Sequence, residues 1–227
     1  LDLRPGGEEV LEDDVLLGKQ LFYRAADPRI SRDGYLSCAS CHLEGRSDHQ
    51  VWDFTHLGEG LRNTTSLLGL GSLGDGPLHW SGNFDEVQDF EGALRGTMGG
   101  SGFLEDADWE EVMDPLGASA AGLSPELDAL EAYVQSLTDL PPSPWRAVDG
   151  GLTAQAELGR TIFNTAAAGC AGCHPAPGYT DSQWLSPGEP LLHDVGTLTE
   201  ASGGRLGEEL TGLDTPTLRG IFATAPY

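Results

Sequence analysis

The stretches Cys38-Ala39-Ser40-Cys41-His42 and Cys170-Ala171-Gly172-Cys173-His174 decide the fold of this chain, and together they contain all four of its cysteines. Two thiols three residues apart lie on one turn and reach both vinyl groups at the edge of a haem. The adjacent histidine then lies under the ring as an axial ligand of the iron. The sequence therefore predicts two covalently bound c-type haems, held by Cys38, Cys41 and His42 and by Cys170, Cys173 and His174.

Three other uses of paired cysteines fit these motifs less well. A structural zinc ion takes four ligands, whereas each motif offers three, so the two copies would have to share ligands. A dithiol redox site does not require a histidine in both copies. A disulfide that spans three residues is uncommon. Haem attachment is the interpretation that uses every residue of both motifs.

An internal repeat precedes the two motifs. Gly18-Lys19-Gln20-Leu21-Phe22 stands before the first motif, and Gly159-Arg160-Thr161-Ile162-Phe163 stands before the second. Each copy is expected to form a short helix, then a loop, then the cysteine motif. The repeat predicts a mostly α-helical fold of two cytochrome c-like domains, each around one haem, with long glycine-rich loops.

Three helices are predicted from their end signals. Acidic residues in an opening turn favour a first helix from Glu8 or Glu9 to Tyr23. Thr153 is a candidate N-cap for a helix that ends near Phe163. Between them, Ser124-Pro125-Glu126 opens a helix through Leu137, because serine caps well, proline suits the first helical position and apolar residues recur at helical spacing.

The segment Pro141-Pro142-Ser143-Pro144 is the predicted linker. We place the domain boundary there, so that residues 1–145 form the domain of the first haem. Residues 146–227 form the domain of the second haem, which we expect to be truncated at its end. The stretches 56–83 and 92–103 are rich in glycine and predict irregular loops, which in compact domains usually carry function or surround a cofactor.

The charge of the chain limits its partners. It has 12 basic and 36 acidic residues and a formal net charge of −24. Nucleic acids and anionic membrane surfaces are polyanions, so neither is an expected partner. The expected partner is a small redox protein with a basic face, the alternative being that the acidic residues serve only solubility. No apolar run approaches the ~20 residues that span a bilayer. Since c-type haems are attached outside the cytoplasm, we expect a periplasmic or extracellular protein that has lost its export signal.

Further motifs occur in the order known from one protein family. The sequence resembles bacterial dihaem cytochrome c peroxidases and their MauG-type relatives over most of its length. The resemblance rests on Leu17-Gly18-Lys19-Gln20-Leu21-Phe22, Asp27-Pro28-Arg29-Ile30-Ser31, Leu36-Ser37-Cys38, Arg62-Asn63-Thr64, His79-Trp80-Ser81-Gly82, Asp214-Thr215-Pro216-Thr217-Leu218-Arg219 and Thr224-Ala225-Pro226-Tyr227.

The resemblance implies roles for both haems and for several residues. The N-terminal haem would meet hydrogen peroxide, and the C-terminal haem would store electrons. Trp80 would relay electrons between them, the alternative being a tryptophan of the core with a satisfied N–H. A calcium ion would be bound by Asn63 and by backbone oxygens of Thr224 and Pro226, since oxygen ligands suit a hard cation.

The proton-transferring carboxylate of the family has no direct counterpart. Peroxidase members carry a glutamate on the distal side of the first haem, where it moves a proton between the peroxide oxygens. In this chain its position falls in Gly99-Gly100-Ser101-Gly102. Glu91 is the candidate substitute, with Asp89 beside it. The alternative, which we favour from the sequence, is that both acids form the solvated face of a short helix.

The sixth ligand of the first iron has three histidine candidates. In the family, a loop histidine occupies this position in the resting state and leaves on activation. His56 is nearest to that spacing and is the predicted distal ligand. His49 is expected to be a surface or haem-edge residue, and His79 to hydrogen-bond a propionate.

The sixth ligand of the second iron is not supplied by an evident residue. Family members provide a methionine or tyrosine beyond the segment that ends here at Tyr227, so the native chain is expected to continue or another group fills the position. Met98 and Met113 are expected to fill gaps in the core. His193 is expected near the second haem without binding its iron.

Three functions remain open at this level. The first is an enzyme that reduces hydrogen peroxide at the N-terminal haem with electrons from the C-terminal haem. The second is a MauG-like oxidase of tryptophan or tyrosine on a partner protein. The third is an electron carrier or redox subunit of a larger chain or complex, in which both irons are six-coordinate.

Overall fold

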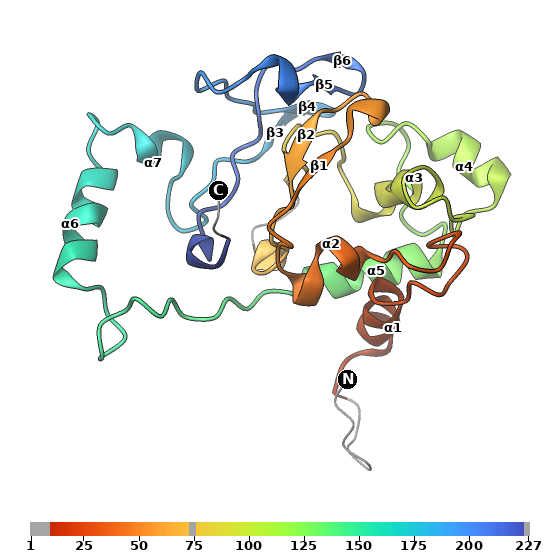
Figure 1. Cartoon of the computed structure of the whole chain (residues 1–227), viewed down its shortest axis with the longest axis horizontal. Coiled ribbons are helices and arrows are strands. Elements are labelled where there is room, and N and C mark those ends of the chain that lie inside the picture. Colours follow the sequence, from red (N-terminus) through yellow and green to blue (C-terminus); the bar gives the residue numbers. More distant parts are fainter. Residues whose placement is uncertain (1–9, 73–75, 225–227) are drawn as a thin grey trace.

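The computed structural model describes residues 10–72 and 76–224 (Figure 1). Helices and irregular segments dominate it, and its strands form three two-stranded antiparallel sheets among these residues. The mostly helical expectation is therefore confirmed in outline, with small hairpins that the sequence did not predict.

Helices α1 (Asp13–Phe22) and α5 (Pro125–Ser136) pack against each other and carry the main core. Their contact is close because Gly18 has no side chain. A Cβ atom at Gly18 would lie 1.7 Å from the carbonyl oxygen of Ala129 on α5. Further along the contact, the rings of Phe22 and Tyr133 meet edge to face at 5.1 Å.

The predicted start of the first helix is wrong. Residues 10–12 are not helical, and α1 begins only at Asp13. Glu12 is the N-cap, with an extended backbone (φ −59°, ψ 151°), and the acids of the first turn are Asp13 and Asp14. Residues 8 and 9 lie outside the described residues.

The other two predicted helices are confirmed. The Ser124 hydroxyl accepts the N–H of Leu127 at 3.3 Å, and α5 has its proline at the first position. The Thr153 hydroxyl accepts the N–H of Ala156 at 3.2 Å, and α6 runs over Ala154–Phe163. Both caps use a side-chain oxygen to satisfy an N–H that the helix itself cannot.

The remaining elements are short. Helices α2 (Cys38–Cys41) and α7 (Cys170–Cys173) are single turns, and α3 (Glu91–Arg95) and α4 (Asp106–Val112) flank a glycine-rich loop. The expectation that 56–83 and 92–103 are wholly irregular is therefore too broad. The strands are β1 (Val51–Asp53) with β2 (Leu61–Asn63), β3 (Trp184–Ser186) with β4 (Glu189–Pro190), and β5 (Gly204–Arg205) with β6 (Glu208–Glu209).

The chain crosses from α5 to α6 in an extended segment that contains the predicted proline linker (Figure 1). After α7 it returns to the first part of the molecule. The Arg205 guanidinium donates to the carbonyl oxygens of Ser81 at 2.8 Å and Gly82 at 2.9 Å. The Arg62 guanidinium donates to the carbonyl oxygen of Gly204 at 3.0 Å. The hairpins of the second part thus pack on β2 and on the loop that carries Trp80.

Candidate functional site

The first cysteine motif forms one tight turn. The N–H of Ser37 donates to the Ser40 hydroxyl at 3.0 Å, and the N–H of His42 donates to the Cys38 carbonyl oxygen at 2.9 Å. The turn places both thiols and the histidine on one short segment, as haem attachment requires. Cys38 packs against the α1–α5 core, and this burial raises the pKa of its thiol to about 12.

The second cysteine motif repeats this geometry. The N–H of His174 donates to the Cys170 carbonyl oxygen at 3.0 Å. His42 has φ −110° and ψ 56°, and His174 has φ −118° and ψ 60°. None of the four cysteines forms a disulfide. The two copies of the sequence motif are therefore also two copies of one local structure.

Both motif histidines are oriented by a backbone carbonyl. Nδ1 of His42 is 3.0 Å from the carbonyl oxygen of Thr65, and Nδ1 of His174 is 2.9 Å from that of Tyr179. With the proton on Nδ1, the lone pair of Nε2 is left for a metal. Burial lowers the pKa of His42 to about 4, so its imidazole is neutral at pH 7 and competent as a ligand.

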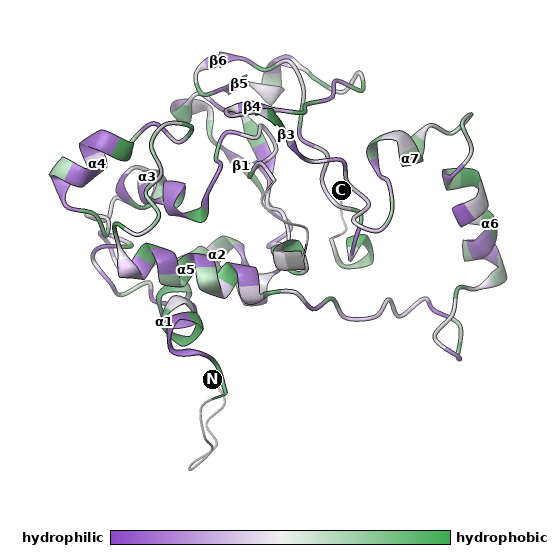
Figure 2. Ribbon diagram, turned by 180° about the vertical axis from the view of Figure 1, so that it is seen from behind, coloured by the Kyte–Doolittle hydropathy of each residue, from purple (hydrophilic) through white to green (hydrophobic). Residues whose placement is uncertain are grey.

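The second half of the chain offers an apolar face that suits a porphyrin. Helix α6 is amphipathic (Figure 2) and contributes no buried side chain among the described residues. Leu158 and Ile162 on α6 are 61% and 54% exposed. Together with the thiols and the oriented histidines, this face shows that the residues present fit a c-type haem. Those that would hold the two haems are Cys38, Cys41, His42, Cys170, Cys173 and His174.

Trp80 joins the two halves of the molecule. Its indole N–H donates to the carbonyl oxygen of Asn63 at 2.8 Å, and its own carbonyl oxygen accepts the N–H of Asp214 at 2.7 Å. The half-buried indole lines a cavity of about 150 Å³ together with Arg62 and Ser202. The N–H is satisfied, as the alternative of a core tryptophan predicts, and the role of Trp80 as a relay stays a prediction.

Glu91 and Asp89 are buried, so the expectation of a solvated helix face is wrong. Glu91 is fully buried, and its carboxylate accepts hydrogen bonds from Nε of Arg95 at 2.8 Å and from the backbone N–H groups of Phe103 and Leu104 at 2.9–3.1 Å. A Cβ at Gly102 would lie 1.9 Å from Oε1 of Glu91. The fold thus places the Glu91 carboxylate against the loop 99–102, which contains no acidic residue of its own.

Asp89 has the proton affinity of a group that titrates near neutrality. Burial raises its pKa from 3.8 to about 7, although its carboxylate accepts the backbone N–H groups of Asp85 and Glu86 at 3.1 and 3.2 Å. The desolvation of the charged form outweighs these two hydrogen bonds.

The histidine candidates lie in different surroundings. His56 is exposed on a 3-10 turn (Thr55–Leu57). His49 is exposed, with Nδ1 at 3.4 Å from the carbonyl oxygen of Thr224. His79 has Nδ1 at 2.8 Å from the side-chain oxygen of Asn83. The assignment of His56 to the first iron stays a prediction.

The methionines and the calcium ligands complete the predicted set. Met98 packs against the core, as expected, but Met113 is 58% exposed and fills no gap. Of the three calcium ligands, Asn63 ends β2, Thr224 follows a 3-10 turn, and Pro226 lies outside the described residues. The calcium site stays a prediction.

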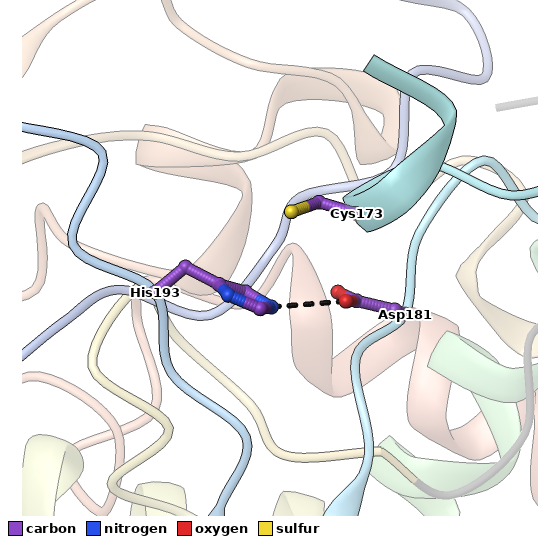
Figure 3. Close-up of side chains that lie close together, drawn as sticks. All are labelled: Cys173, Asp181 and His193. Atoms are coloured by element: carbon purple, nitrogen blue, oxygen red, sulfur yellow. Dashed lines mark hydrogen bonds and ion pairs between the residues drawn. The ribbon is translucent and has the colours of Figure 1, made fainter. Parts of the chain in front are cut away.

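One group of side chains was only partly expected. His193 lies near the second cysteine motif, where it contacts Asp181 at 2.9 Å, and both lie beside Cys173 (Figure 3). The sequence signalled His193 but not Asp181, since nothing in a single sequence shows that residues 12 apart meet across a turn. The sequence indicated Asp214 only as the first residue of a family motif. In the structure, burial raises the pKa of its carboxyl group to about 7.

A family model described as di-haem cytochrome c peroxidase matches residues 12–138, which is more than half of the chain. The chain belongs to the di-haem cytochrome c peroxidase family. The match includes the first cysteine motif, Trp80, Glu91 and α5. The resemblance inferred from the sequence motifs is thereby confirmed.

Two relatives at 28% identity carry names of different kinds. The chain is 28% identical to hydrazine synthase subunit gamma of Kuenenia stuttgartiensis, over 88% of this chain and 62% of that protein. It is also 28% identical to cytochrome-c peroxidase IdrP1 of Denitromonas iodatirespirans, over 84% of this chain and 54% of that protein. The chain thus spans less than two thirds of the length of these two relatives.

The fold is shared with a solved family structure. A MauG-like protein associated with microbial copper homeostasis superposes with a TM-score of 0.60 at 23% identity, over 99% of this chain and 74% of that one. None of the helices among the described residues has the length and hydrophobicity of a transmembrane segment.

Proposed function

We propose that this member of the di-haem cytochrome c peroxidase family is an oxidoreductase that reduces hydrogen peroxide at the His42 haem with electrons from the His174 haem. When bound, the two haems would supply one-electron transfer and an iron that activates peroxide. The observation that carries the proposal is the position of Trp80, which hydrogen-bonds to segments leading to both motif histidines.

The connection from Trp80 to the first motif is short. The indole N–H donates to Asn63 at 2.8 Å, and Asn63 lies two residues before Thr65. The carbonyl oxygen of Thr65 in turn accepts the hydrogen bond from His42 at 3.0 Å. A tryptophan held in this way is oriented by the same strand end that orients the first axial histidine.

The connection to the second motif runs through Asp214. Its N–H donates to the Trp80 carbonyl oxygen, and its carboxylate accepts from the Ser182 hydroxyl at 2.9 Å. The N–H of Ser182 donates to the Thr180 hydroxyl at 2.9 Å. Thr180 follows Tyr179, whose carbonyl oxygen accepts from His174. These contacts support Trp80 as the relay between the two sites.

The proton that peroxide reduction requires would come from a carboxyl group of this chain. Glu91 was the sequence candidate, and it remains one by its contact with the glycine loop. Asp89 has the better proton affinity, because its pKa of about 7 is matched to proton transfer near neutral pH.

The remaining assignments are part of the same proposal. The net charge of −24 favours an electron donor with a basic face, such as a cytochrome c or a cupredoxin. A calcium ion would bind at Asn63, Thr224 and Pro226. A c-type haem protein of this family would act in the periplasm or outside the cell.

A second function is favoured by the contacts of Glu91. Both of its carboxylate oxygens are engaged in buried hydrogen bonds, and a carboxylate that holds a loop in place is poorly suited to shuttle a proton. This observation favours an electron-transfer subunit without peroxidase activity, or a MauG-like oxidase with different distal groups.

The test is spectroscopic. We would record optical and EPR spectra of the chain with both haems attached, oxidised and half-reduced, and then add one equivalent of hydrogen peroxide. A high-spin signal that disappears on addition supports the peroxidase. Two low-spin haems unchanged by peroxide in both redox states contradict it and leave the electron carrier.

A variant tests the relay separately. Trp80→Phe removes the indole N–H and its hydrogen bond to Asn63, so we expect slower electron transfer between the haems and slower peroxide turnover. Trp145→Phe is the matched control, because Trp145 directly follows the proline linker and is 78% exposed. Equal rates in both variants would contradict the relay.

A further inference from the structure

One arginine of the second half binds the backbone directly after Trp80. Arg205 lies on β5, and its Nε atom donates to the carbonyl oxygen of Ser81 at 2.8 Å. Its Nη2 atom donates to the carbonyl oxygens of Gly82 at 2.9 Å and Gly188 at 3.3 Å. One planar guanidinium thus connects the Trp80 loop with β5 and with the turn between β3 and β4.

The contacts of Arg205 are with carbonyl oxygens rather than with a carboxylate. Its cross-strand neighbour on β6 is the exposed Glu208. Nevertheless, no ion pair of Arg205 with an acidic side chain is found in the part of the chain that the structure describes. The N–H donors of a guanidinium form a rigid fork, whereas an ammonium is a compact charge on a flexible stem. The arrangement therefore uses the shape of the guanidinium and not the neutralisation of its charge.

The β5–β6 hairpin that carries this guanidinium is itself fixed to the first half of the chain. Arg62 of β2 donates to the carbonyl oxygens of Ser202 at 2.6 Å and Gly204 at 3.0 Å. Glu59 pairs with Arg62 at 2.8 Å, and its other carboxylate oxygen accepts the N–H of Leu206 at 3.2 Å. The guanidinium therefore projects from a base that is held on both sides.

The Trp80 loop needs such outside contacts because its backbone is strained. His79 and Gly82 flank Trp80 and Ser81, and their φ angles are positive, 66° and 59°. A non-glycine residue in this region costs free energy and persists where surrounding contacts hold it. The buried Ser81 hydroxyl has no hydrogen-bond partner among the described residues, so this side chain does not anchor the loop. The contacts to the backbone carbonyl groups have that role.

We propose that Arg205 is a positioning residue for Trp80, whose indole it holds in place through the carbonyl groups of Ser81 and Gly82. The inference rests on the relay proposed above. In that relay one electron passes between the two haems, and no bond forms or breaks. Because the rate of transfer depends on the geometry of the path, loss of the guanidinium fork slows the transfer without removing either haem.

The experiment uses the whole 227-residue chain with both haems attached. In the half-reduced protein, flash photolysis measures electron transfer between the haems, and we expect Arg205→Gln to slow it at least about tenfold. Ultraviolet resonance Raman reads the hydrogen bond of the Trp80 indole N–H, isolated as the difference between each protein and its Trp80→Phe derivative. We expect a weaker hydrogen bond to Asn63 in Arg205→Gln, which a role in overall stability alone does not predict.

Two further variants separate the fork from the charge. Arg205→Lys keeps the charge and the aliphatic stem but not the fork, so we expect it to resemble Arg205→Gln, and it is measured alone if Arg205→Gln does not fold. If Arg205→Lys has the rate and the indole band of the parent, the charge is sufficient and the proposal is wrong. Arg146→Gln is the matched control and should change neither measurement, because Arg146 is exposed and also donates to a backbone carbonyl, that of Gly150 at 3.4 Å.

The Trp80→Phe variant keeps failure of the relay apart from failure of the positioning role. Parent-like transfer in that variant contradicts the relay, and the indole band alone then decides whether Arg205 positions Trp80. Where Trp80→Phe is slow, a parent-like rate in Arg205→Gln overturns the positioning role, whatever the indole band. An unchanged indole band in both Arg205 variants overturns it in every case.

Discussion

Glu91 has a negative charge at a position without exposed surface, and its partners explain how the fold tolerates it. Arg95 lies one helical turn away and neutralises the charge, and the N–H groups of Phe103 and Leu104 take the remaining acceptor positions. A buried ion pair adds little net stability, but removing one partner leaves an uncompensated charge. The side chain therefore holds the glycine loop 99–104 against α3.

At this scale we expect Glu91→Gln to lower the free energy of unfolding by about 2 kcal/mol, because an amide offers one acceptor oxygen and removes the charge that faces Nε of Arg95. Arg95 keeps its ion pair with Asp106, which limits the loss. Urea unfolding measures this, with Glu110→Gln on the exposed face of α4 as the control. Unchanged stability together with lost peroxide turnover would instead make Glu91 the catalytic carboxylate.

At the scale of the element, the equivalent glycines of the two short repeats, Gly18 and Gly159, lie in different environments. Gly18 lies in the crossing of α1 and α5, where a Cβ would overlap the carbonyl of Ala129. Gly159 occupies the equivalent position of α6, and a Cβ there would meet nothing within 4 Å. Close helix packing therefore requires glycine in the first copy of the repeat but not in the second.

We expect Gly18→Ala to destabilise the chain by about 2 kcal/mol or more, because α1 must move away from α5. Gly159→Ala should be neutral or stabilising by up to about 1 kcal/mol, since alanine is the better helix former. Thermal unfolding of both variants by circular dichroism checks the difference. Equal losses in the two variants would mean that α6 is packed as closely as α1.

At the scale of the whole molecule, the two halves meet where Asp214 binds the backbone of Trp80. Asp214 is 8% exposed, and burial raises its pKa from 3.8 to about 7. The folded chain therefore keeps this proton up to about pH 7, whereas the unfolded chain loses it near pH 4. Since the folded state binds more protons between these values, this carboxyl group lowers stability as the pH rises through that window.

We expect Asp214→Asn to remove this contribution, which amounts to at most about 1.4 kcal/mol per pH unit. The variant should be more stable than the parent at pH 8 and similar to it at pH 4, as measured by urea unfolding in EDTA. The exposed Asp194→Asn variant is the control. If parent and Asp214→Asn differ by the same amount at both pH values, the proton is not held by Asp214.

The sequence by itself determined the features that depend on neighbouring residues. The turn of each cysteine motif and the caps at Ser124 and Thr153 were predicted correctly, because each is formed by contacts within a few residues. The order of the motifs was also enough to place the chain in its family. The start of α1 was wrong, since several acidic residues before Asp13 give equivalent start signals.

Only the tertiary structure decided the features that join distant segments. It buried Glu91 against a loop that follows it by about a dozen residues, attached Trp80 to both Asn63 and Asp214, and brought Asp181 and His193 to Cys173. The physical reason is that the burial of a side chain, the pKa of a carboxyl group and the choice of ligands depend on which distant residues pack against that side chain. The spacing of residues along the sequence does not indicate those contacts.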